Sequence, residues 1–238
     1  MDYTILDASN DFLQLSNAIT KLEWELCGKV NIDSGSDDFR IITLDGIQQY
    51  LLSLTAYIRA FCALQIQLNN NTDAFLKILD IGIHNVQEFE DKRIIYKFPI
   101  EWLVTMVHFQ IDSFFWEALK SNWEKVEGFY KRMTKVLGHI KIDIKEEDKI
   151  KNTLQCLASF RNSFHNSGVH IISNMDKVKW MNGLEPQRGT YDKAFESEWL
   201  NIIFKHKEEV YYEGRKILYL LIKESIDITY LIMKKLYY

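Results

Sequence analysis

A short run near residue 165 concentrates the side chains of this sequence that could do chemistry. Arg161, Asn162 and His165 fall within five residues, and Asn166 and His170 follow shortly. An arginine offers a planar fork of donors that suits a phosphate. A histidine near neutral pH can accept or release a proton. Together these groups could cleave RNA without a metal ion, with the ribose 2′-OH as the internal nucleophile.

Two interpretations of this run stay open from the residues alone. In the functional one, Arg161 stabilises a charged phosphorane, His165 acts as base or acid, and Asn162 orients either partner. In the structural one, Arg161 and His165 interact with the carbonyl groups that end a helix. Asn-Ser-Gly, which follows at 166–168, is ordinary helix-ending chemistry.

The helix that must hold the run is predicted over about 146–167. Its apolar residues recur at three-four spacing, as Ile150, Leu154, Leu157, Phe160 and Phe164 do. At about 100° per residue, the arginine of the run falls inside this stripe and the histidine lies on its edge, one turn later. An unpaired buried charge costs several kcal/mol, so the guanidinium is expected to meet an anion or acceptors.

The Arg-Asn pair followed shortly by His, near the end of a bundle helix, resembles the HEPN superfamily. The resemblance covers about 145–170 by motif and the rest as an all-helical pattern. The usual motif leaves four to six residues between Arg and His, whereas three separate Arg161 from His165 and eight separate it from His170. Asn166 stands where the His of the four-residue form would be.

Membership of that superfamily would imply a helical bundle that commonly works as a dimer, with the motif facing its twin. Many members are metal-independent RNases of defence and toxin-antitoxin systems, so an inhibitory protein partner is also implied. The function predicted is therefore an RNA-directed protein, specifically a metal-independent endoribonuclease. The alternatives are a catalytically silent helical module that binds a nucleotide, RNA or a protein, and an interaction scaffold without a nucleic-acid ligand.

The rest of the chain predicts an all-α, multi-helix up-and-down bundle in one domain, 1–238. Apolar stripes of helical period occur at 12–26, 47–61, 103–118 and 126–137, and a long helical region is expected from about Glu196 to Met233. The residues at 169–180 suggest a short β-hairpin with its turn near Asn174 to Asp176. No stretch is rich enough in Pro, Gly or Ser to act as a linker between domains.

Composition limits the classes of partner. Apolar residues make up 47% of the chain and the net charge is −4, so we expect a compact globule rather than a polycation that coats nucleic acid. Basic side chains nevertheless gather before the motif helix, where they could guide a phosphate backbone or simply form a solvated face. They are Lys131, Arg132, Lys135, Lys141 and Lys145.

Further expectations concern location, cofactors and assembly. The stretch Ile217 to Met233 contains three charged residues, so no membrane span is predicted, and the start lacks a secretion signal, which favours the cytoplasm. The histidines lack ligand spacing and there is no P-loop or dinucleotide fingerprint, so no metal or cofactor is expected. Aromatic residues are 13% of the chain, which with the HEPN resemblance predicts a homodimer.

Overall fold

The structure is a computed structural model, and it describes residues 5–31, 37–68, 97–120, 126–140, 142–165, 177–181, 201–205, 211–212 and 216–236. Long helices dominate these ranges, which confirms the predicted all-α bundle. The helices are α1 (Ile5–Val30), α2 (Phe39–Leu68), α5 (Lys97–Lys120), α6 (Phe129–His139), α7 (Ile144–His165) and α8 (Lys216–Lys235).

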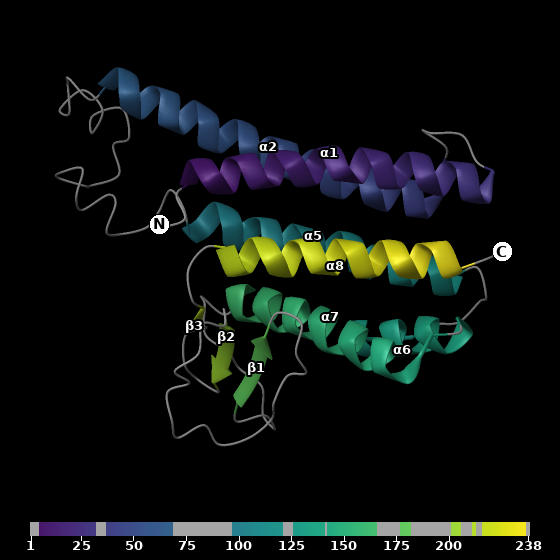
Figure 1. Ribbon diagram of the computed structural model, residues 1–238. Helices are drawn as coiled ribbons and strands as arrows, with labels where there is room; N and C mark the ends of the chain where they lie inside the picture. The colour runs from purple at the N-terminus through teal and green to yellow at the C-terminus, as the bar shows by residue number, and fades with distance from the viewer. Residues whose placement is uncertain are drawn as a thin grey trace.

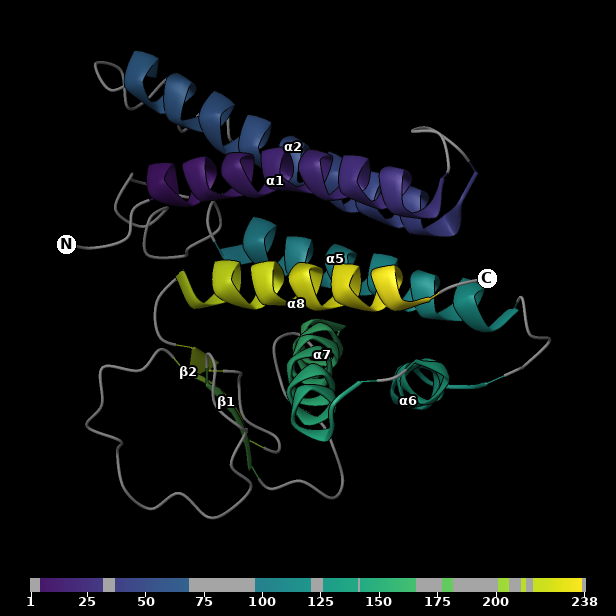
Figure 2. The same ribbon diagram turned by 45° about the vertical axis from the view of Figure 1, so that its right-hand side comes forward.

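The helices lie in three layers (Figure 1; Figure 2). The α1 and α2 helices form the first layer, α5 and α8 the second, and α6 and α7 the third. The middle layer contacts both others, through α2 with α5, α1 with α8, α5 with α7 and α7 with α8. Each helix therefore has an apolar face directed at a neighbour, as the three-four spacing of its apolar residues requires.

The core is continuous through the middle layer. The α5 stripe, Leu103 to Ala118, is buried at every predicted position. In α7 the predicted stripe is buried from Ile150 to Phe160, whereas Phe164 is only half-buried. The two stripes pack on each other, as their length and periodicity predict.

Two polar contacts tie α8 to the first layer. Arg40 is buried; its guanidinium Nη1 donates to the main-chain oxygen of Leu236 at 3.1 Å, and it forms an ion pair with Asp38 at 2.7 Å. The Tyr230 hydroxyl donates to Glu25 at 2.9 Å. The end of α8 is thus held to the α1–α2 pair by directional bonds as well as by apolar packing.

A small antiparallel sheet accompanies the bundle. Its strands are β1 (Lys177–Met181), β2 (Asn201–Lys205) and β3 (Tyr211–Tyr212), in the order β1-β2-β3, with Lys179 opposite Ile203. The pairing differs from the hairpin predicted at 169–180, because β1 pairs with a strand some twenty residues later. Residues 169–176, including the predicted turn, lie outside the described residues.

The last helix is shorter than the sequence indicated. The helical region predicted from Glu196 is interrupted by β2 and β3, and α8 begins at Lys216. Of the helices that the structure describes, none combines the length and the apolar character needed to cross a membrane.

Candidate functional site

The α7 helix positions the Arg-Asn…His run at its C-terminal end. It begins at Ile144 and ends at His165, within two residues of the predicted bounds. Glu146 and Glu147 lie in its first turn, where carboxylates interact favourably with the helix dipole. Its buried face is held against α5 and α8, so the start of the run is carried by a packed helix.

Arg161 lies at the margin of the buried face of α7, which corrects its predicted place inside the apolar stripe. The residue is half-buried, and its guanidinium carbon lies 4.8 Å from the ring centroid of Phe109 in α5. Its Nη1 donates to Oδ1 of Asn162 at 2.9 Å. The guanidinium is therefore positioned by a ring and an amide. The sequence had also allowed a carboxylate as its partner.

The guanidinium of Arg161 retains unused hydrogen-bonding capacity. Its buried Nε has no hydrogen-bond partner, and no carboxylate within the described part of the chain forms an ion pair with this side chain. Arginine carries five N–H donors in a fixed plane, and the bond to Asn162 uses one of them. The buried Nε is closed to a ligand, so an anion that binds this cation would approach its Nη atoms.

His165 is the last residue of α7 and lies one helical turn after Arg161. Its side chain lies outside the described residues, as do Asn166 and His170 altogether. Of the predicted site residues, the structure brings together Arg161 and Asn162.

Phe109 is the member of the site that the sequence analysis missed. Its side chain is 37% exposed, and its neighbour His108 is buried with its ring 4.6 Å from that of Phe129, centroid to centroid. The one available signal was its position, since Phe109 is an aromatic residue outside the apolar stripe of α5. Which residue would cover such a ring depends on how α7 packs against α5.

Arg132 shows how an arginine is used structurally in the same region. Its Nη2 lies 2.6 and 2.7 Å from the two carboxylate oxygens of Asp112 in α5, and its Nη1 donates to the main-chain oxygen of Val126 at 3.2 Å. Its guanidinium carbon also lies 5.7 Å from the Trp116 ring centroid. This member of the predicted basic stretch anchors α6 to α5, whereas Lys141 and the side chain of Lys145 lie outside the described residues.

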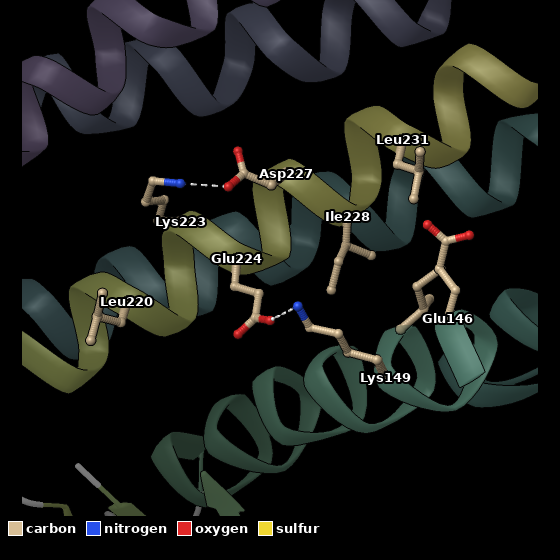
Figure 3. A pocket seen from close by; sticks show the side chains of 9 residues that line it. Glu146, Lys149, Leu220, Lys223, Glu224, Asp227, Ile228 and Leu231 are labelled. Carbon is tan, nitrogen blue, oxygen red and sulfur yellow. Dashed lines mark hydrogen bonds and ion pairs between the residues drawn. The ribbon is translucent and has the colours of Figure 1, made fainter. Parts of the chain in front are cut away.

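A cavity of about 440 Å³ lies between α7 and α8 (Figure 3). Lys149 reaches across from α7 to Glu224 of α8 at 2.8 Å, and Lys223 pairs with Asp227 at 2.6 Å. The side chain of Glu224 is only 14% exposed. Lys149 binds Oε1 of Glu224, whereas the buried Oε2 of Glu224 has no hydrogen-bond partner, and the Lys223–Asp227 pair lies within α8. We assign the Lys149–Glu224 pair to the joint between the two helices.

The buried thiol beside this joint is chemically quiet. Burial, and to a lesser degree the Glu224 carboxylate, raises the pKa of Cys156 well above its usual range. The thiol therefore stays neutral, and the residue packs as a small apolar side chain, as the sequence predicted.

Comparison with known proteins adds no relative to this picture. No protein-family model matches the chain, and neither the curated proteins nor the solved structures contain a significant match. The HEPN resemblance accordingly stays a prediction from the motif and the helical pattern.

Proposed function

We propose that the end of α7 is an RNA-directed site in which Arg161 binds a backbone phosphate. The observation that carries the proposal is a half-buried guanidinium, backed by Phe109, that no described carboxylate neutralises. A cation in partly buried surroundings gains from an anionic partner, and the planar fork of arginine matches phosphate oxygens. Asn162, already bonded to Nη1, holds the fork in one orientation.

The proposed reaction is metal-independent cleavage of the RNA backbone. The 2′-oxygen attacks the adjacent phosphorus, the bond from phosphorus to the 5′-oxygen breaks, and a 2′,3′-cyclic phosphate and a 5′-hydroxyl remain. A base takes the proton of the 2′-OH and an acid supplies one to the leaving oxygen. His165, one turn beyond Arg161, is proposed for one of these transfers, and Arg161 for stabilising the charged phosphorane.

The HEPN resemblance extends the proposal to a biological setting. It suggests an effector of a defence or toxin-antitoxin system, held inactive by a protein partner. The support for this setting is the Arg-Asn…His motif together with the helical bundle, and the biochemical proposal does not depend on it.

The test is an RNA cleavage assay with a chelator present. Wild type should cut single-stranded RNA and leave DNA of the same sequence intact, because DNA lacks the 2′-OH. Arg161→Ala should be inactive, whereas Arg59→Ala, which removes the same charge from an exposed position on α2, should cut normally. His165→Ala should lower the rate by about 10²–10⁴, the worth of a positioned acid or base.

His170→Ala belongs in the same assay, because the family spacing leaves the identity of the catalytic histidine open. If that variant alone lost activity, the proposed reaction would stand and the proton transfer would be assigned to His170 instead of His165. Equal cleavage by wild type and Arg161→Ala would refute the proposed site.

A catalytically silent module that binds RNA is the second candidate. The arrangement of Arg161 over Phe109, with Nη1 held by Asn162, is sufficient for binding and requires no acid or base. Such a protein would bind single-stranded RNA tightly, lose affinity on Arg161→Ala, and yield no cyclic phosphate under any metal condition.

A further inference from the structure

The α6 helix presents a row of cations away from the core. Met133, Val136 and Leu137 are buried on one side of this 11-residue helix. On the exposed side, Lys131, Lys135 and His139 follow one another at four-residue spacing. Residues so spaced lie one above the next, so Lys131 and Lys135, the row of cations, form a line along the helix that the imidazole of His139 continues.

A hollow of about 480 Å³ runs beside this row of cations. Its other lining residues are Val126, Tyr130, Thr134 and Gly138. Tyr130 is 49% exposed, and the space into which a side chain at position 138 would extend is open. An aromatic wall, an open floor and flanking cations are the parts with which proteins bind single-stranded nucleic acid, by stacking a base and pairing the phosphates.

Lys131, the exposed residue next to Arg132, does not take part in an ion pair with any described carboxylate. The Arg132 guanidinium is bonded to Asp112, whereas Lys131, the preceding residue, is exposed and has no carboxylate partner in the described part of the chain. The nearest acid in the sequence is Glu127, exposed just before the helix. Lys131 therefore offers positive charge that no carboxylate in the described part of the chain neutralises.

The α6 helix also meets α5 close to the proposed RNA site. Arg132 of α6 binds Asp112, and Arg161 of α7 covers Phe109, three residues earlier on the same helix. Three residues correspond to about 4.5 Å along a helix axis. Figure 2 shows α6 and α7 in the same layer beneath α5.

We propose that the outward face of α6 is a second contact for single-stranded RNA, with a base in the hollow against Tyr130 and phosphates on Lys131 and Lys135. The choice of RNA rests on the proposed function of the α7 site; the contact itself rests on the hollow and the row of cations. A strand held at Arg161 continues onto α6, so the α6 face binds the part of the strand that is not cut.

The experiment measures the affinity of the full chain for a labelled 2′-O-methyl oligouridine of about 20 nucleotides, longer than the site of one small binding module. This strand resists attack by its own 2′-oxygen, so binding is measured without cleavage. Affinity is recorded over a salt series by fluorescence anisotropy. The test variants are Lys131→Gln with Lys135→Gln, and Gly138→Leu; the control is Lys21→Gln with Lys29→Gln, two exposed lysines of α1.

The lysine pair on α6 should lower both the affinity and its salt dependence. Each lost phosphate contact lowers the slope of log K against log salt by about 0.7 for single strands, so the double variant should lose about 1.4. Gly138→Leu should fill the hollow and weaken binding roughly 5- to 100-fold, the worth of one stacked base, with an unchanged slope. Replacing a glycine within a helix does not lower helix propensity, so this variant should fold.

The outcomes separate this inference from the proposed function. If the α6 pair and the α1 control pair show the same affinity and the same slope, the α6 contact is refuted, whatever Arg161→Ala does. If the α6 variants weaken binding while Arg161→Ala leaves it unchanged, the α6 contact stands and the α7 site is refuted.

Discussion

At the scale of single residues, three arginines show two ways in which this fold uses a guanidinium. Arg40 forms an ion pair with Asp38, and Arg132 forms a bidentate one with Asp112. Arg161 instead rests on an aromatic ring, a contact worth about 0.5–1 kcal/mol at an exposed site. Of these three arginines, Arg161 is the one that no carboxylate in the described part of the chain neutralises.

The Asp38–Arg40 pair makes a prediction about acid stability. Burial alone would raise the pKa of Asp38, but hydrogen bonds from Arg40, its charge and the Ile41 amide together lower it. Unfolded Asp38 therefore binds a proton more readily, so its contribution to stability is complete above about pH 4 and is lost as the pH falls through the lowered value. Thermal melts from pH 7 to pH 2 should show a smaller acid loss in Asp38→Asn than in wild type. Parallel curves would contradict this role.

The residue-level chemistry of the site was only partly predictable from the sequence. The motif and a helical wheel located Arg161 on the correct helix and near the apolar face. The wheel placed it inside the stripe, whereas the structure places it at the margin, because the boundary of a buried face is set by the neighbouring helix. Phe109 belongs to that neighbour, and a contact between residues 52 positions apart leaves no signal in the local sequence pattern of either helix.

At the scale of the elements, the packing of α7 on the middle layer should dominate stability. Leu157 is fully buried in the core that α7 shares with α5 and α8. Leu157→Ala should lower the free energy of unfolding by about 2–5 kcal/mol, from lost transfer energy and the cavity left behind. A denaturant melt measures this directly, and a loss well under 1 kcal/mol would mean that Leu157 is not a core residue.

The joint between α7 and α8 makes a second prediction at this scale. Lys149→Ala would leave the mostly buried Glu224 carboxylate without its cation, at a cost of about 1–3 kcal/mol. Combining it with Glu224→Gln should recover part of that loss, because the stranded charge is then removed. The four free energies of unfolding form a double-mutant cycle. Strict additivity would show that the two charges do not interact.

Element type was predictable where the periodicity was long and failed where it was short. The bounds of α7 followed from five apolar residues in register with the helical period. The strand β2 is a short run, Asn201 to Lys205, and such runs fit a buried strand or a helix equally. Its partner β1 lies some twenty residues earlier, so the pairing is non-local and a local pattern does not reveal it. The predicted helix was therefore extended from α8 back over β2 and β3.

At the scale of the whole molecule, the prediction of a homodimer rests on the aromatic content and on the HEPN resemblance. A dimer that faced the end of α7 toward its twin would place two Arg161 side chains about one shared strand. Light scattering should therefore return a mass near twice 28.2 kDa. A monomer across a wide concentration range would remove the shared site, while each chain would keep its own Arg161.

The proposed RNA site depends most on Arg161 as the residue that binds a backbone phosphate. The most direct measurement is the affinity of Arg161→Ala for the uncleavable oligouridine, compared with Arg59→Ala. Arg59 is exposed on α2, and among the described residues it bonds only to the uncharged side chains of Ser9 and Asn10. The two variants therefore lose the same charge at opposite layers. Arg161→Ala should bind at least about tenfold more weakly, since a hydrogen bond to a charged group is worth about 1.5–3 kcal/mol, and Arg59→Ala should bind as wild type does. Equal affinity of the two variants would contradict the account.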